Sequence, residues 1–257
     1  MGLGRKIINS KLVERFKRQL VLKTGIYFRI KKVNPTVSES LRIAKLLNHF
    51  KITKVLDVGA NTGQFAESII DFGYTGKIVS FEPVESAYQS LLKRANMYKN
   101  WQVADKMAIG NMDGEININV SEDTHFSSIK TIKEDYVKQT SSTKIQHQEK
   151  VPIFKLDSLK DKFHSDEDSI LLKIDTQGFE KEVIEGAPEL LKNIKGLLIE
   201  APLINHMEIY DDVEWDITHY FDFLYKMGFK LVSIEPVATD SKSGFVNEVN
   251  CVFMRLE

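Results

Sequence analysis

The segment V-L-D-V-G-A-N-T-G, residues 55–63, joins an apolar strand pattern to a helix pattern. Glycines in such a turn let the backbone bend tightly and let a ligand approach it closely. A nicotinamide dinucleotide site would show G-x-G-x-x-G, but Asn61 and Gln64 stand where its second and third glycines belong. An acid, Asp57, precedes Gly59 by two residues. The segment therefore suits a positively charged group better than a pyrophosphate.

The next two strand patterns end in residues that suit a nucleoside. The first ends S-F-E-P, and an acid such as Glu82 at the end of a second strand is well placed to accept hydrogen bonds from both ribose hydroxyls. The second ends at Ala108 and Ile109, a small apolar patch at the level where an adenine ring would lie. Two acids, an apolar slot and no phosphate cradle together suit S-adenosylmethionine, which carries a sulfonium and an ammonium but no phosphate.

A second polar group lies in L-L-K-I-D-T-Q-G-F-E, residues 171–180. Lys173 and Asp175 are two residues apart and so share one face of a strand. A lysine inside an apolar strand is costly unless it is paired. We interpret the group as a polar floor beneath the reacting atoms. The purely structural alternative is an ion pair between Lys173 and Asp175, with Glu180 capping the helix that follows.

Two residues are candidates for a general base. One is Asp175, and the other is His206, because an unperturbed imidazole has a pKa near 6.5. Asp175, Glu200, His206 and Glu208 are also suitable ligand types for a divalent metal, but their spacing matches no firm motif. We therefore assign no metal ligand and leave the dependence on a divalent metal open.

Strand and helix patterns alternate along most of the chain. Single helices between strands imply right-handed crossovers and a largely parallel sheet that is covered on both faces. The last two strands are joined by a short polar loop, so we expect this pair to be antiparallel. The expected strands are 54–58, 77–81, 101–109, 169–174, 196–200, 229–234 and 247–254, and the expected helices are 38–50, 63–72, 84–98, 179–191 and 213–227.

The middle of the chain departs from this alternation. Residues 115–120 alternate in polarity and predict a hairpin with a neighbouring strand through the turn at 112–114. Residues 121–150 are polar and lack clear periodicity, which is typical of a lid or a mobile insertion. Within them, Ser127 and Ser128 could donate hydrogen bonds to a cofactor carboxylate or to a substrate oxygen.

Charge is unevenly distributed along the 257 residues. The formal net charge of -1 argues against a general nucleic-acid binder. By direct count, however, residues 1–32 hold ten Lys or Arg and one acid. Residues 3–22 have helical spacing, so they predict a helix packed on the main domain or a basic amphipathic helix that touches a membrane surface or an acidic partner. We expect an N-terminal helical extension over residues 1–50 and one main domain over residues 51–257.

Composition restricts the compartment. The chain is 42% hydrophobic and 28% charged, an ordinary globular balance. Its single cysteine, Cys251, rules out an internal disulfide framework and favours a reducing compartment. The longest stretch without a charged residue, 58–66, is too short for a membrane span and contains two glycines. We expect a cytoplasmic protein, and its oligomeric state stays open.

Taken together, the motifs V-L-D-V-G-A-N-T-G-Q-F, S-F-E-P, K-M-A-I-G-N-M-D-G and L-L-K-I-D-T-Q-G-F-E-K-E-V-I-E-G-A resemble the FkbM-type methyltransferase family over about residues 53–232. The resemblance implies a class I, Rossmann-like methyltransferase fold with a seven-stranded sheet in the order 3-2-1-4-5-7-6 and strand seven antiparallel. It also implies S-adenosylmethionine as cofactor. By that match Asp57, Gly59, Asn61 and Gly63 line the methionine end, Glu82 holds the ribose, and Lys173, Asp175 and Glu180 lie at the active site.

The expected activity is methyl transfer to a hydroxyl oxygen of a sugar, glycan or natural-product small molecule, because the resemblance implies such acceptors. A base that takes the hydroxyl proton typically contributes about 10²–10⁴-fold, and Asp175, oriented by Lys173, or His206 would be that base. One alternative is a non-catalytic module of the same fold that binds a nucleotide or a partner. Another is an NAD-dependent oxidoreductase, which the missing glycines disfavour. The basic N-terminus leaves a lipid-linked or anionic acceptor open.

Overall fold

The computed structural model describes residues 34–163, 165, 167–204 and 209–256. The chain divides into two compact units, residues 1–38 and 39–257, and all the elements below belong to the second. The expected helix over residues 3–22 lies outside the described residues. No helix in the described part of the chain is long and apolar enough to span a membrane.

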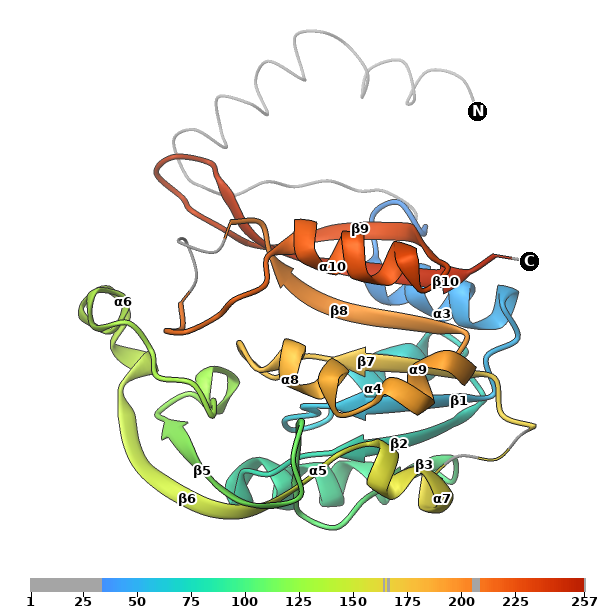
Figure 1. Ribbon diagram of the computed structural model, residues 1–257, viewed down its shortest axis with the longest axis horizontal. Coiled ribbons are helices and arrows are strands. Elements are labelled where there is room, and N and C mark those ends of the chain that lie inside the picture. The colour runs from blue at the N-terminus through green and yellow to red at the C-terminus, as the bar shows by residue number, and fades with distance from the viewer. Residues whose placement is uncertain (1–33, 164, 166, 205–208, 257) are drawn as a thin grey trace, which may run out of the picture. The chain divides into compact units, whose positions relative to one another are not determined.

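The main sheet has seven strands in the described residues, in the order β3-β2-β1-β7-β8-β10-β9 (Figure 1). The first five are parallel, and β10 runs antiparallel to both β8 and β9. When these seven strands are numbered along the chain, their order in the sheet is 3-2-1-4-5-7-6. The seventh strand, β10, is the antiparallel one, as expected. The strand bounds are β1 Lys54–Val58, β2 Lys77–Phe81, β3 Trp101–Val103, β7 Ile170–Ile174, β8 Gly196–Pro202, β9 Phe229–Thr239 and β10 Val246–Arg255.

Helices cover both faces of this sheet. Because side chains alternate along a strand, Val55 and Leu171 pack with α3, α4 and α5, whereas Leu56 and Leu172 pack with α8, α9 and α10. The two apolar clusters so formed make a three-layer unit whose sheet is buried on both faces, which confirms the expected architecture. The helices are α3 Glu39–His49, α4 Gln64–Asp71, α5 Glu85–Ala95, α7 Lys160–Phe163, α8 Glu180–Glu185, α9 Pro188–Asn193 and α10 Ile217–Lys226.

A second, three-stranded sheet lies beside the main one and contains β4 (Ala108–Ile109), β5 (Gly114–Ser121) and β6 (Ile145–Phe154). Strand β6 lies in the middle, parallel to β4 and antiparallel to β5 (Figure 1). The predicted hairpin through residues 112–114 is therefore wrong, because β6 separates the two strands that this turn connects. The predicted strand 101–109 is also divided between two sheets.

Residues 122–144 connect β5 to β6. They contain two short 3₁₀ turns, η1 (Thr124–Phe126) and η2 (Ser141–Thr143), and the helix α6 (Glu134–Gln139). Since β6 begins at Ile145, the last six residues of the segment expected as a lid or insertion are part of a strand.

Two predicted helices have different bounds for identifiable reasons. The helix expected over 179–191 is two helices, α8 and α9, which are separated at Gly186. Pro188 begins the second helix because proline lacks the N–H that a continuous helix would need there. The helix expected over 213–227 begins later, where the Asp216 side chain caps α10 by accepting hydrogen bonds from two backbone amides.

Candidate active site

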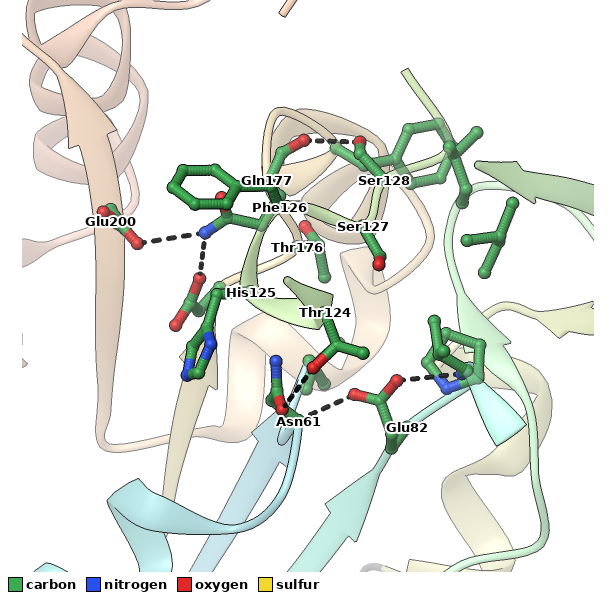
Figure 2. Close-up of a pocket in the computed structure, with 18 of the residues that line it drawn as sticks. Asn61, Glu82, Thr124, His125, Phe126, Ser127, Ser128, Thr176, Gln177 and Glu200 are labelled. Atoms are coloured by element: carbon green, nitrogen blue, oxygen red, sulfur yellow. Dashed lines mark hydrogen bonds between the residues drawn. The ribbon is translucent and has the colours of Figure 1, made fainter. Parts of the chain in front are cut away.

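A cavity of about 410 Å³ opens at the carboxyl ends of β1, β2, β7 and β8 (Figure 2). This volume is typical of small-molecule sites, and parallel α/β sheets bind their ligands at this edge. The second sheet, the segment after β5 and the paired strands β9 and β10 complete the wall. The lining includes Gly59, Asn61, Glu82, Ala108, Ile109, Ile118, Thr124, His125, Phe126, Ser128, Tyr136, Asp175, Gln177, Glu200, Val237 and Glu248.

The turn after β1 packs tightly against the turn after β7. Gly59 has a φ of 74°, and a Cβ there would lie 1.8 Å from the carbonyl oxygen of Asp175. Asn61 is also left-handed and lines the cavity. Gly63, the N-cap of α4, lies against the Trp101 ring and does not line the cavity. Of the predicted loop glycines, Gly59 therefore shapes the cavity wall and Gly63 the packing behind it.

Asp57 and Lys173 form a buried row with Ser80 across three neighbouring strands. The register places Asp57 beside both partners, Lys173 Nζ lies 3.0 Å from Asp57 Oδ1, and Ser80 Oγ donates to Asp57 Oδ2 over 3.0 Å. Asp57 has no exposed area, and neither it nor Lys173 lines the cavity. Asp57 can therefore reach a ligand only through the loop that it supports.

Lys173 joins this row to the cavity. Its ammonium donates to the Gly59 carbonyl over 3.0 Å and lies 3.4 Å from Asp175 Oδ2, so the ion pair considered from the sequence is present. Burial lowers the pKa of Lys173, but the carboxylates of Asp57 and Asp175 raise it more, and the net shift is upward. Lys173 thus stays charged and connects the two turns at the rim.

Glu82 lines the cavity at the end of β2, where the ribose site was predicted. It is 5% exposed, and its two carboxylate oxygens each accept a backbone N–H over 2.8 Å, from Asn61 and from Val84 (Figure 2). Burial raises the pKa of Glu82 to about 7. The carboxylate is held rigidly beside the glycine turn, and its charge changes near neutral pH.

We expect the affinity for S-adenosylhomocysteine to rise about tenfold between pH 6 and pH 8, because only ionised Glu82 can accept both ribose hydroxyl hydrogen bonds and its pKa is about 7. Calorimetric titration across this range measures the slope. Glu82→Gln should bind weakly with no slope. Glu180→Gln is the matched control, because Glu180 also has a pKa raised by burial to about 7 but does not line this cavity. A flat wild-type profile would contradict the ribose assignment.

An apolar slot lies next to Glu82. Ala108 and Ile109, predicted as the floor of an adenine site, are buried and line the cavity. Ile118 from the second sheet and Phe179 from the turn before α8 line it as well. Sequence reasoning missed these two residues because their strand and turn come from distant parts of the chain.

Asp175 lines the cavity at the end of β7 with about a third of its side chain exposed. Its Oδ1 accepts a hydrogen bond from Gln177 Nε2 over 2.8 Å. Burial raises the pKa of Asp175, but the Lys173 ammonium and the hydrogen bonds together lower it by more than burial raises it. The net shift of the pKa is therefore downward. The cavity therefore presents an ionised carboxylate where a reacting atom could lie.

Glu180 lies behind this turn rather than in the cavity. It is 4% exposed and accepts hydrogen bonds from the backbone N–H groups of Thr176, over 2.7 Å, and Gly178, over 3.0 Å. From this position it holds the turn that carries Asp175 and Gln177. The other candidate base, His206, and the possible metal ligand Glu208 lie outside the described residues.

Two further acids line the cavity beyond Asp175. Glu200 lies two residues before the end of β8 and was noted from the sequence, whereas Glu248 comes from β10 and carried no sequence signal. Burial raises the pKa of Glu200 well above its usual value, and the nearby charge of Asp175 raises it further. Burial likewise raises the pKa of Glu248. In the described part of the chain, no group of three His, Cys, Asp or Glu side chains is arranged to hold a metal ion.

The segment Thr124–Ser128 covers the cavity and is hydrogen-bonded on both sides (Figure 2). Thr124 Oγ1 donates to Asn61 Oδ1 over 3.3 Å. Ser128 Oγ donates to the Gln177 carbonyl over 2.5 Å. Ser127 Oγ accepts from a backbone N–H of β5. The two serines singled out from the sequence therefore bind protein groups here, and Ser128 joins the segment to the turn after β7.

The cavity lining fits S-adenosylmethionine. Four carboxyl groups line it, from Glu82, Asp175, Glu200 and Glu248, and no lysine or arginine is found among the described residues that do so. Such a lining suits a sulfonium and an ammonium, and its described residues offer no permanent cation to a pyrophosphate. Glu82 would hold the ribose and the apolar slot the adenine.

The strand order, the glycine turn and the acid that follows β2 define a class I, Rossmann-like methyltransferase fold. The family described as the Methyltransferase FkbM domain matches residues 57–238. The chain belongs to this family and is an S-adenosylmethionine-dependent methyltransferase.

Solved structures with a similar fold include a putative RNA methyltransferase from Pyrococcus horikoshii, at 12% identity and a TM-score of 0.45, covering 94% of this chain and 100% of that one. TehB from Haemophilus influenzae is 10% identical with a TM-score of 0.47, covering 93% and 67%. A SAM-dependent methyltransferase from Aquifex aeolicus is 15% identical with a TM-score of 0.42, covering 88% and 100%. Comparison with curated protein sequences gives no significant match.

Proposed function

We propose that this chain transfers a methyl group to a hydroxyl oxygen of a sugar, a glycan or a natural-product small molecule. The observation that carries the proposal is that the carboxyl group of Asp175, whose net pKa shift is downward, lines the same cavity as Glu82. An aliphatic hydroxyl is a poor nucleophile, so its methylation needs a base within reach of its proton. Asp175 supplies that base beside the cofactor site.

When bound, S-adenosylmethionine supplies a methyl group that is already activated by a positively charged sulfur. The cavity walls align the acceptor oxygen with the methyl carbon, which is catalysis by proximity. With the cofactor bound, Asp175 would take the hydroxyl proton while the acceptor oxygen bonds to the methyl carbon and the carbon–sulfur electron pair returns to sulfur. Lys173 keeps the Asp175 carboxylate ionised until it accepts that proton.

The wall beyond Asp175 mixes apolar and polar groups. Phe126, Tyr136 and Val237 offer apolar surface, and Glu200 and Glu248 offer hydrogen-bonding groups. Sugars and polyketide-type molecules present both kinds of surface, because their hydroxyls project from a carbon framework. This lining supports a small-molecule or carbohydrate acceptor rather than a nucleic acid, because its described residues offer no lysine or arginine to the phosphates of a nucleic acid.

The test is transfer from S-adenosylmethionine with a radiolabelled methyl group to a panel of sugars, glycans, polyketide alcohols, amines and RNA. NMR of the labelled product distinguishes a methyl ether from a methylamine. A methyl ether on a panel alcohol supports the proposal. Label found only on nitrogen or RNA would overturn it. Binding of S-adenosylhomocysteine without transfer to any acceptor would favour the non-catalytic binding module instead.

A further inference from the structure

We propose that Gln177 is a positioning residue for methyl transfer, which fixes the direction in which the Asp175 carboxylate faces the acceptor. The inference rests on the proposed function, in which Asp175 is the base. Gln177 lies in the turn after β7 and lines the cavity (Figure 2). Neither the ion pair at Lys173 nor the backbone of the turn sets this direction by itself, as the contacts of the two Asp175 oxygens show.

The side-chain amide of Gln177 is held by three groups. Tyr210 donates its hydroxyl hydrogen to Gln177 Oε1 over 2.8 Å. Gln177 Nε2 donates to Asp175 Oδ1 over 2.8 Å and reaches Glu200 Oε2 at 3.5 Å. The reverse orientation of the amide would turn its oxygen toward two carboxyl groups, so Tyr210 and the acids select one orientation.

The two oxygens of Asp175 have different partners. Oδ1 accepts from Gln177, whereas Oδ2 faces the Lys173 ammonium at 3.4 Å. Lys173 is itself tied to Asp57 and to the Gly59 carbonyl, so its main effect is to balance charge in the buried row. Gln177 supplies the second, directional bond. The Glu200 carboxyl group also interacts with Asp175 through a hydrogen bond, but Gln177 and Lys173 are the donors that fix the plane of the carboxylate from its two oxygens.

The backbone of Gln177 is also fixed. Its φ is 57°, an unusual value for a residue with a side chain. The Glu180 carboxylate holds the amides on either side, at Thr176 and Gly178. Ser128 Oγ donates to the Gln177 carbonyl over 2.5 Å, which ties the residue to the segment that covers the cavity. These contacts stabilise a strained conformation that directs the side chain at Asp175.

The experiment compares the wild type with Gln177→Met, which keeps the length of the side chain and removes its hydrogen bonds. We expect kcat to fall about 10- to 100-fold, because a hydrogen bond to a charged group is lost and the base is misplaced. The KM and the affinity for S-adenosylhomocysteine should stay within about threefold, because Asp175 is not a ribose or adenine contact. Gln89→Met is the matched control, because Gln89 is exposed on α5 and hydrogen-bonds only Glu85 among the described side chains.

Two readouts separate positioning from a structural role. The first readout is the acid limb of the kcat/KM profile, and the second is the pKa of Asp175 followed by ¹³C NMR in aspartate-labelled protein. Both should move up by about one pH unit in Gln177→Met, because the ionised carboxylate loses a hydrogen-bond donor. Tyr210→Phe, which removes the group that orients the amide, should shift both in the same direction by less. The NMR measurement needs no acceptor.

The outcomes distinguish the two proposals. If the wild type forms no methyl ether, the proposed hydroxyl chemistry fails, and the NMR titration still reports whether Gln177 controls Asp175. If the wild type methylates a hydroxyl but Gln177→Met retains its kcat, or the pKa of Asp175 is unchanged, Gln177 is not a positioning residue. A large loss of S-adenosylhomocysteine affinity in Gln177→Met would likewise overturn the inference, since it would place the residue in the cofactor site.

Discussion

Asp175→Asn should bind S-adenosylhomocysteine about as tightly as the wild type and should transfer methyl groups about 10²–10⁴-fold more slowly. The amide cannot accept the hydroxyl proton, but it keeps nearly the shape of the carboxylate and stays clear of the ribose site at Glu82. Steady-state kinetics with an acceptor found in the transfer panel, together with calorimetry for the cofactor product, separate these two effects.

The matched control for this substitution is Asp222→Asn, because Asp222 is exposed on α10 and pairs with Lys226. It should leave kcat unchanged. Full turnover by Asp175→Asn would remove Asp175 from the chemistry. The base would then have to be sought among the other acids and the histidine that line the cavity outside the ribose site, Glu200, Glu248 and His125, or at His206.

Lys173→Met should lower the free energy of unfolding by about 3–5 kcal/mol, because removing one partner of a buried ion pair leaves an uncompensated charge. Asp57 has no exposed area, and Lys173 Nζ is the cation that contacts it in the described part of the chain. Urea denaturation measures the change as a lower transition midpoint with a similar m-value.

A second variant identifies the cause of that loss. The double variant Asp57→Asn and Lys173→Met removes both the cation and the buried carboxylate that it neutralises. No unpaired charge is then left in the buried row, so part of the lost stability should return. Lys226→Met is the control, because its ion pair with Asp222 lies in solvent and such pairs contribute little. Equal stability of the wild type and Lys173→Met would show that the buried row is not a major source of stability.

The sequence predicted the main sheet well because its signals are local. Each strand is a short apolar run bounded by a turn or a helix, and the polar loop after β9 indicated the antiparallel last pair. The second sheet was not predicted. Its strands β5 and β6 are distant in the sequence and pair through long-range contacts. The turn at residues 112–114 resembles a hairpin turn, but β6 lies between the two strands that this turn connects.

The same distinction applies to the candidate site. Gly59, Asn61, Glu82 and Asp175 were found because each follows a strand that the pattern reveals, and the carboxyl ends of parallel strands meet at one edge. The buried contact of Asp57 with Lys173 depends on the register of β1 and β7, which no local pattern fixes.

Contacts between distant segments were beyond the reach of a single sequence. The hydroxyl of Tyr210 meets Gln177 across the turn after β7, and Glu248 reaches the cavity from the last strand. Their neighbours in the sequence give no sign of these positions, because loop conformation and strand irregularity decide them. Strand β10 shows such an irregularity next to Glu248.

We expect the connection between β5 and β6 to make acceptor preference separable from methyl-donor binding. Residues 122–144 begin at the end of β5 and end at the start of β6, and these two strands are paired with each other. Between these ends, the segment brings Thr124, Phe126 and Tyr136 to the cavity wall. Ser128, Ile132 and Thr143 anchor the connection in the structure, whereas its exposed positions tolerate changes at small energetic cost. Diversification of relatives, or a chimera made in the laboratory, can therefore exchange this connection and alter what is methylated while β1, β2 and their nucleoside pocket stay the same.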